Sequence, residues 1–456
     1  MTTVGEGAEP QRSDITKAGL AALVASSIEW YDFFIYLTAA ALVFPAVFFP
    51  ESSAVAGVLA SFSTAAVGFV ARPIGGVLFG HFGDKLGRKP TLVIALVLMG
   101  TATVLVGLLP GFATIGVWAP ILLFVFRFCQ GLAIGGQWGG AVLLATEYAP
   151  PNRRGLFGSL AQTGVPVGVI FGNLIFLAVG AVTTEAQFLA WGWRIPFLIG
   201  VLLIGVAMYI QLRLEETPAF RHLEEEQQEG NETQQRSPVL EVIKEHPKQI
   251  LLAGGAFFVI NGSFYILISG ILDYGTRSLG LSSDAMLTAV LISSAIQIPA
   301  LLGFAALTDR VGRRPVYLIG AVLLGLWAFP MFWLVNTRDI VLITLALSFG
   351  QIFLSMMYGP QAALFAEMFS ARVRYSGASL GYQGAAVFAG GLAPIIMVWL
   401  LETTGTSLSV SFYILAMAAI TFISVYLITD TYEDEMSQDV AGESEAIARE
   451  RDATTS

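Results

Sequence analysis

The chain has 456 residues, of which 55% are hydrophobic and only 12% are charged, against about 25% charged in ordinary soluble domains. A soluble protein of this composition would expose large apolar patches, so soluble classes are excluded. The net charge of −9, without a basic patch, excludes nucleic-acid binding. The apolar residues fall in runs of about 20, long enough as helices to span a membrane and unlike the alternating strands of a membrane β-barrel. The sequence therefore predicts an all-α polytopic membrane protein.

The apolar runs predict about 12 transmembrane helices. In chain order they occupy residues 18–44, 54–79, 90–110, 119–145, 156–180, 192–212, 249–274, 285–308, 315–335, 339–366, 375–401 and 408–429. One long polar connection divides them into two sets of six. We therefore expect a cytoplasmic N-terminus at 1–17, an N-terminal six-helix bundle at 18–212, a cytoplasmic inter-bundle loop at 213–248, a C-terminal six-helix bundle at 249–429 and an acidic cytoplasmic tail at 430–456.

Basic residues predict the orientation. Most of the 24 Lys and Arg residues fall in the termini and in connections that share a side with them. By the positive-inside rule this predicts cytoplasmic termini and a multi-pass protein of the cell (inner or plasma) membrane. The two halves also repeat each other, because GDKLGRKP from Gly83 after the second span is echoed by TDRVGRRP from Thr308 after the eighth. Two repeated halves are typical of a transporter whose substrate path runs between them.

Several motifs together resemble one transporter family. GHFGDKLGRKPTL from Gly80 and RFCQG from Arg127 resemble signatures of the major facilitator superfamily. IEWYDFFIY from Ile28, GGQWGGAVLLATEYAP from Gly135 and WGWRIPF from Trp191 resemble its metabolite:proton symporter family, which carries shikimate, 2-oxoglutarate, citrate, proline and betaine. The resemblance implies the twelve-helix fold in two bundles and a cytoplasmic latch. The expected conformational gate residues are Gly80, Asp84, Gly87, Arg88, Lys89, Asp309 and Arg313.

Four charged residues lie well inside predicted spans, away from their ends, where a charge costs about 2.5–3.5 kcal/mol and needs a reason. Glu29 and Asp32 are three residues apart on one face of the first helix, Arg72 is in the second and Arg127 in the fourth. The functional interpretation is a proton-titrating carboxylate, Asp32 or Glu29, paired with an Arg that also attracts substrate. The alternative is a structural ion pair. All three histidines fall in predicted cytoplasmic segments, so a carboxylate must carry any coupled proton.

The expected substrate-binding residues extend from these charges into both halves. They are Arg127, Arg72, Tyr31, Gln137, Trp138, Tyr358, Tyr382 and Gln383. The symporter family usually has Glu where this chain has Gln137, which puts a proton role at that position in doubt. Asn261, Tyr265, Gln297, Gln351 and Gln361 are further polar residues in spans, and lone polar residues there often serve only as interhelical hydrogen bonds.

The leading functional hypothesis is proton-coupled symport (uptake) of a small polar metabolite, most plainly an organic acid such as a shikimate-like or dicarboxylate anion. The alternatives are symport of zwitterionic solutes such as proline and betaine, drug export, or a non-transporting sensor. An enzyme is not expected, because no zinc-protease H-E-x-x-H motif or aspartyl membrane-protease G-x-G-D motif is present. The only cysteine, Cys129, offers neither a disulfide nor a metal site. We expect no cofactor beyond the proton gradient, the lipid bilayer as environment, and a monomer.

Overall fold

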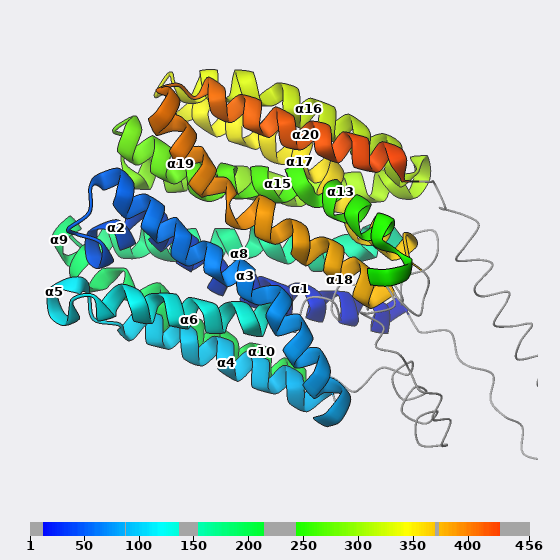
Figure 1. Ribbon diagram of the computed structural model, residues 1–456, viewed down its shortest axis with the longest axis horizontal. Coiled ribbons are helices and arrows are strands. Elements are labelled where there is room, and N and C mark those ends of the chain that lie inside the picture. The colour runs from blue at the N-terminus through cyan, green and yellow to red at the C-terminus, as the bar shows by residue number, and fades with distance from the viewer. Residues whose placement is uncertain (1–11, 87, 136–153, 214–242, 370–373, 429–456) are drawn as a thin grey trace, which may run out of the picture.

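The computed structural model describes residues 12–86, 88–135, 154–213, 243–369 and 374–428. Throughout these ranges the regular structure is helical (Figure 1). The helices fall into two groups, which we call the N-terminal group and the C-terminal group. In Figure 1 the C-terminal group lies above the N-terminal group, and their long helices run roughly side by side.

The N-terminal group contains long helices joined at their turns by three short ones. Its elements are α1 (Arg12–Leu42), α2 (Phe44–Phe48), α3 (Ala54–Leu86), α4 (Arg88–Leu108), α5 (Phe112–Ile115), α6 (Trp118–Gly135), α8 (Arg154–Val182), α9 (Glu185–Gln187), the π-helix η2 (Phe188–Gly192) and α10 (Arg194–Arg213). The short helices α2, α5 and α9 fall at or beyond the ends of the predicted spans.

The C-terminal group contains two long helices that are interrupted by π-turns. Its elements are α13 (Pro247–Tyr265), η3 (Ile266–Gly270), α14 (Ile271–Asp273), η4 (Tyr274–Ser278), α15 (Ser283–Val311), α16 (Arg313–Val335), α17 (Ile340–Glu367), α18 (Arg374–Ala385), η5 (Ala386–Gly391), α19 (Ala393–Thr404) and α20 (Leu408–Leu427). Because π-turns are rare and concentrate at functional sites, η3, η4 and η5 mark the helices α13–η4 and α18–α19 for attention.

The predicted spans correspond to helices. Nine helices within the described ranges are long and apolar enough to cross a membrane, and a bent pair, Glu185–Gly192 with Arg194–Val206, makes a tenth if it counts as one span. Helix α1, which carries Glu29 and Asp32, and the shorter apolar stretch Val93–Leu108 of α4 fall outside those nine. The second half of the predicted span 119–145 lies outside the described residues.

Glycines allow the helices of the N-terminal group to approach closely. Gly164, Gly168 and Gly172 recur every four residues on the face of α8 that packs on α1. A Cβ at Gly168 would lie 2.7 Å from the backbone nitrogen of Tyr31 and 2.8 Å from the carbonyl carbon of Trp30. Such small-residue faces are how membrane helices reach tight packing. The contact fixes the depth and rotation of α1, which carries the mid-membrane carboxylates.

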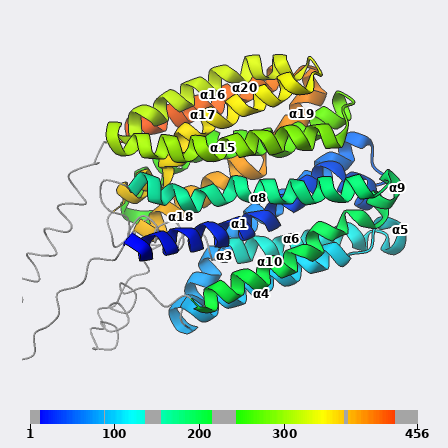
Figure 2. The same ribbon diagram turned by 180° about the vertical axis from the view of Figure 1, so that it is seen from behind.

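Helix α8 is shared between the two groups. It packs on α1 within the N-terminal group and on α15 of the C-terminal group. Figure 2, which views the protein from behind, shows α8 running between α1 and α15. The interface between the groups is completed by α3 against η5 and α19, and by α8 against α17.

Candidate functional site

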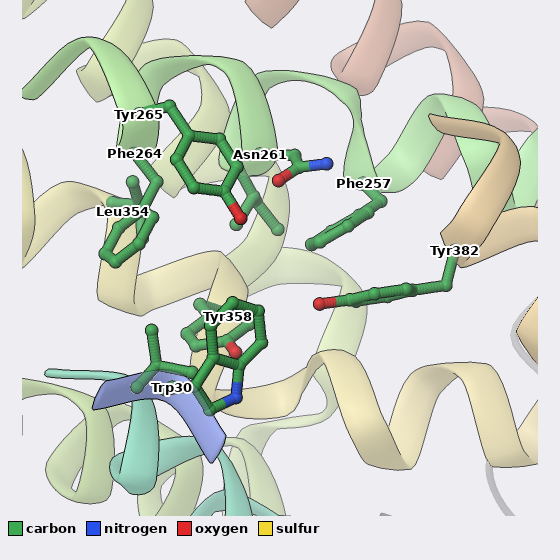
Figure 3. A pocket seen from close by; sticks show the side chains of 10 residues that line it. Trp30, Phe257, Asn261, Phe264, Tyr265, Leu354, Tyr358 and Tyr382 are labelled. Atoms are coloured by element: carbon green, nitrogen blue, oxygen red, sulfur yellow. The ribbon is translucent and has the colours of Figure 1, made fainter. Parts of the chain in front are cut away.

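A cavity lies where the two groups meet (Figure 3). Its lining comes from α1, α8, α13, α17 and α18, and comprises Trp30, Val165, Phe257, Ile260, Asn261, Phe264, Tyr265, Leu354, Tyr358 and Tyr382. The cavity volume is about 20 Å³, room for roughly one water molecule. A metabolite can enter only if the two groups separate around it.

Aromatic rings form the walls of this cavity. The rings of Phe257 and Tyr382 stack with centroids 4.2 Å apart. Figure 3 shows the Tyr382 hydroxyl extending toward Tyr358 and Trp30 on the opposite wall. Trp30 stacks on Phe34 at 5.6 Å, and Phe34 in turn meets Phe264 of the C-terminal group at 5.6 Å. Ring contacts therefore build the walls, and the contact of Phe34 with Phe264 joins the two groups.

Arg72 lies behind the aromatic wall. Its side chain is only 2% exposed, and its guanidinium lies 4.6 Å from the ring centroid of Phe33 and 4.5 Å from that of Phe69. It also reaches Trp30, which lines the cavity, at 5.7 Å and interacts electrostatically with Tyr265. The atoms Nε and Nη2 have no hydrogen-bond partner. Buried N–H groups are normally paired, so these donors remain available to an anion.

The guanidinium group of Arg127 also lies close to Phe33, 4.5 Å from its ring centroid, and 4.1 Å from that of Tyr36. Gly68 makes the room, because a Cβ there would lie 2.7 Å from Nε of Arg127. Nη1 of Arg127 donates to Oε1 of Gln130 at 3.1 Å, while Nε and Nη2 have no partner. A second buried cation with unused donors thus borders the same region.

The predicted carboxylate–arginine pair is found with an amide between its members. Nε2 of Gln130 donates to Oδ2 of Asp32 at 3.3 Å and to Oγ1 of Thr103 at 2.8 Å, while its Oε1 accepts from Arg127. Asp32 is 1% exposed, and its Oδ1 has no hydrogen-bond partner. The side chain of Gln130 therefore links Asp32 to Arg127 through two hydrogen bonds.

Glu29 completes the set of mid-membrane charges. It is half-buried, precedes the cavity residue Trp30, and interacts electrostatically with Arg72 and Asp32. Tyr31, in contrast, turns away from the cavity, since its hydroxyl donates to the carbonyl of Pro196 in α10 at 2.8 Å. Trp30 and Tyr31 are adjacent on α1, so a helix that turns Trp30 to the cavity turns Tyr31 toward α10. This geometry does not favour the expected contact of Tyr31 with substrate.

Other expected substrate residues fall in three places. Tyr358 and Tyr382 line the cavity. Gln383 is buried beside it with Oε1 unpartnered but is not part of the lining. Gln137 and Trp138 lie outside the described residues. The lining residues that sequence reasoning did not select are Trp30, Val165, Phe257, Ile260, Asn261, Phe264, Tyr265 and Leu354. The spacing of Phe257, Asn261, Phe264 and Tyr265 on one face of a helix is the signal that could have identified four of them.

The second gate motif connects the two groups at the end of α15. Oδ1 and Oδ2 of Asp309 accept hydrogen bonds from the backbone nitrogens of Gly155 and Leu156 at 2.8 and 3.0 Å, at the start of α8. Arg313 holds Asp309 at 2.9 Å and Glu367 of α17 at 3.1 Å. A carboxylate at a helix N-terminus satisfies free N–H groups and the helix dipole. Asp309 therefore ties α15 to α8 across the interface.

The first gate motif cannot be compared in the same way. Gly87 lies outside the described residues, and the same holds for the side chains of Asp84, Arg88 and Lys89 at the facing ends of α3 and α4, next to Gly80. The expected role of Asp84 as a gate residue stays a prediction. Within the described ranges, no group of three or more His, Cys, Asp and Glu residues could hold a metal ion.

The long apolar helices, the cavity between two groups and the inter-group tie define a membrane transporter. Residues 18–433 match the family model described as "Sugar (and other) transporter". The chain belongs to this family, within the major facilitator superfamily, whose members are transporters and not enzymes.

Named relatives and solved structures agree with this assignment. The chain is 39% identical to the inner membrane metabolite transport protein YhjE of Escherichia coli K12 over 91% of this chain and 94% of YhjE, and 39% identical to the shikimate transporter of the same strain with equal coverage. It is 33% identical to the E. coli K12 proline/betaine transporter, over 91% of this chain and 84% of that protein. A crystal structure of a D-xylose-proton symporter shares the fold, with a TM-score of 0.70 at 19% identity over 91% and 98% of the two chains.

Proposed function

We propose that this transporter takes up a small polar organic acid together with protons. The observation that carries the proposal is the set of four charged groups at mid-membrane depth, Arg72, Arg127, Asp32 and Glu29, next to the cavity between the two groups. The unpartnered guanidinium donors are suited to a carboxylate, because Arg–carboxylate hydrogen bonds are charge-assisted and can be bidentate. Asp32 or Glu29 is the proton carrier in this proposal, since a carboxyl group at that depth responds to a neighbouring anion.

The shikimate transporter, at 39% identity, supports an organic acid as the substrate class. The proline/betaine transporter, at 33%, keeps a zwitterionic solute as the second candidate. The aromatic lining favours that second candidate to some extent, because aromatic rings also attract quaternary ammonium groups. The two arginines weigh against it, since both are buried cations near the cavity and Arg72 already lies over the lining residue Trp30.

Alternating access follows from the same geometry in our proposal. The bundle at 18–212 and the bundle at 249–429 rock against each other, and both termini lie in the cytoplasm. The hydrogen bonds from the first turn of α8 to Asp309 of α15 hold the cytoplasmic side shut. We propose a monomer as the functional unit.

The test is uptake by the purified full-length protein in proteoliposomes whose interior is more alkaline than the medium. Labelled shikimate, 2-oxoglutarate, proline and glycine betaine are compared, with protein-free liposomes and a protonophore as controls. We expect at least one organic acid to accumulate and the protonophore to abolish the accumulation. Accumulation of only proline or betaine would favour the second candidate, and no accumulation of any compound would contradict proton-coupled uptake.

A further inference from the structure

Thr103 of α4 places a buried hydroxyl group against the side chain that links Asp32 to Arg127. Its Oγ1 accepts a hydrogen bond from Nε2 of Gln130 at 2.8 Å, whereas the bond from the same nitrogen to Asp32 measures 3.3 Å. Thr103 therefore holds the amide more closely than the carboxylate does. It is not one of the residues expected from the sequence, because a threonine in an apolar run carries no charge that would single it out.

The backbone of α4 decides how the Thr103 hydroxyl acts. Oγ1 donates its one hydrogen to the carbonyl oxygen of Met99 at 2.9 Å, one turn earlier in the helix. A hydroxyl group has one donor and two acceptor sites, so Thr103 acts toward Gln130 as an acceptor. An acceptor selects the nitrogen end of the amide and leaves its oxygen end to accept from Arg127, as observed. Thr103 thus sets the direction of the Gln130 amide.

Packing on α10 holds Thr103 in place. A Cβ at Gly200 of α10 would lie 3.4 Å from Cγ2 of Thr103 and 3.9 Å from Oδ1 of Asp32, so the methyl group of Thr103 lies against that glycine. Two branches on one Cβ leave few rotamers in a helix. Here one branch is packed and the other is hydrogen-bonded to the helix backbone. The anchor is therefore more rigid than the long Gln130 side chain that it holds.

Arg127 and Asp32 are buried opposite charges with no direct contact among the described hydrogen bonds and ion pairs. Nη1 of Arg127 donates to Gln130, while its Nε and Nη2 and the Oδ1 atom of Asp32 have no hydrogen-bond partner. Opposite charges attract strongly where little water screens them, and a direct pair with two parallel hydrogen bonds would use these free atoms. The position of the Gln130 amide therefore separates the two charges.

We propose that Thr103 is a positioning residue that holds Gln130 between Asp32 and Arg127, and so keeps the free donors of Arg127 open to substrate. Without the hydroxyl group, the amide loses its closest partner, moves away, and lets Arg127 pair directly with Asp32. The inference rests on the proposed uptake of an organic acid, because it concerns how Arg127 stays ready to bind that acid. Thr103 acts through Gln130 and is not among the residues that line the cavity.

The first test compares two substitutions of Thr103 in the full-length protein. Thr103→Val keeps the branched shape and removes the hydroxyl group, whereas Thr103→Ser keeps the hydroxyl group. The probe is whichever of shikimate and 2-oxoglutarate accumulates in the uptake assay, and titration calorimetry measures its affinity. We expect Thr103→Val to weaken binding about tenfold, the loss of one hydrogen bond to a charged group, and Thr103→Ser to bind within about twofold of wild type. Equal losses in both variants, or wild-type affinity in Thr103→Val, would overturn the proposal.

The second test removes the charge that is expected to capture Arg127. In an Asp32→Asn background Arg127 has no carboxylate to pair with, so adding Thr103→Val should change the affinity by less than about twofold. Non-additivity of this kind identifies residues that act within one network. A tenfold loss in both backgrounds would show that Thr103 affects binding by a route that does not involve Asp32, contrary to the proposal.

The third test needs no substrate. Dicyclohexylcarbodiimide reacts with protonated carboxyl groups in apolar surroundings, and peptide mass spectrometry compares the labelling of Asp32 with that of Glu29 in the same protein. A direct pair with Arg127 holds Asp32 ionised, so Thr103→Val should slow the labelling of Asp32 relative to Glu29, and Thr103→Ser should not. Unchanged or faster labelling would mean that no such pair forms. If wild type accumulates no organic acid, the proposed function fails, and the labelling still decides the role of Thr103.

Two further variants serve as controls for these measurements. Thr101→Val changes an exposed threonine of the same helix and should match wild type in affinity and labelling. Gln130→Met keeps the side-chain length and removes the amide, so it should show the same weakened binding and slower labelling of Asp32 as Thr103→Val. Wild-type behaviour of Gln130→Met would contradict the separating role of the amide, even if Thr103→Val fails to fold.

Discussion

Phe33 explains how two buried arginines can lie close together. The guanidinium groups of Arg72 and Arg127 both lie close to its ring, 4.6 and 4.5 Å from the centroid. Cation–π attraction is worth about 0.5–1 kcal/mol at exposed sites and about 2 kcal/mol or more when desolvated, so the ring offsets part of the burial cost without using any N–H donor. Phe33 therefore stabilises the cations and leaves their hydrogen-bonding capacity to other partners.

Replacement of Arg127 by Lys tests that capacity. Lys keeps the positive charge but cannot bind a carboxylate through two parallel hydrogen bonds, and it has no planar group to lie over Phe33 and Tyr36. We expect Arg127→Lys to weaken binding of a carboxylate substrate tenfold or more, about 1.4 kcal/mol. Titration calorimetry on wild type and variant checks this, and wild-type affinity in the variant would mean that Arg127 is only structural.

Replacement of Asp32 by Asn tests proton coupling. Asn preserves the acceptor for Gln130 but cannot gain or lose the proton that balances an incoming anion. We expect Asp32→Asn to lose accumulation driven by a pH gradient while exchange of labelled for unlabelled substrate remains measurable. Accumulation at the wild-type level would eliminate Asp32 as the proton carrier and leave Glu29, whose Gln variant is the matching control.

The sequence identified the charged residues but not the directions in which they point. Glu29, Asp32, Arg72 and Arg127 were detectable because charge is rare inside apolar runs. The bridging position of Gln130 and the inward turn of Tyr31 depend on neighbouring helices, which one sequence does not display. Trp30, an ordinary apolar residue by composition, could not be told from the other aromatic residues around it.

Among the helices, α8 is the element on which the site's geometry depends most. Its glycine face positions α1, and its first turn receives Asp309. Hydropathy alone predicted that α8 exists, since a long apolar run reports burial in lipid whatever its neighbours are. Hydropathy does not distinguish an α-turn from a π-turn, so η3, η4 and η5 were found only in the structure.

An alanine at Gly168 should weaken the α1–α8 contact. Alanine normally raises helix stability by about 1 kcal/mol relative to glycine, but here its Cβ would fall 2.7 Å from the backbone of Tyr31 and force α1 to move. We expect Gly168→Ala to lower the thermal unfolding temperature in detergent and to reduce substrate affinity. Gly303→Ala in α15 is the control, because nothing lies within 4 Å of a Cβ there. A higher unfolding temperature in both variants would contradict the close approach.

Across the whole molecule, the two groups are joined at one end by the Asp309 tie. A carboxylate at a helix N-terminus is worth about 0.3–1 kcal/mol when exposed and up to about 2 kcal/mol when partly buried. The upper figure changes a two-state population ratio by about thirtyfold. This tie alone can therefore decide which side of the transporter is closed.

Loss of the negative charge on Asp309 should weaken the contact between α15 and α8 and so favour opening at that end of the molecule. We expect Asp309→Asn to favour the form open to the cytoplasm and to slow transport, with substrate binding largely unchanged. Single cysteines placed on either side of the cavity in a Cys129→Ser background report the change by their labelling rates. The control is Arg310→Gln, which changes an exposed neighbouring charge. Equal labelling of Asp309→Asn and wild type would mean that the tie does not govern opening.

The narrowness of the cavity has a consequence for the membrane's energy supply. Protons cross proteins rapidly along files of water molecules, and about 20 Å³ holds roughly one such molecule. The stacked rings of Phe257 and Tyr382 and the contacts of Phe34 with Phe264 close that space without substrate. Among the described residues, the cavity between the two groups therefore leaves no room for a file of water molecules in this form. For the proton-coupled uptake proposed above, we expect that this closed cavity limits proton leakage through the carrier when no substrate is bound.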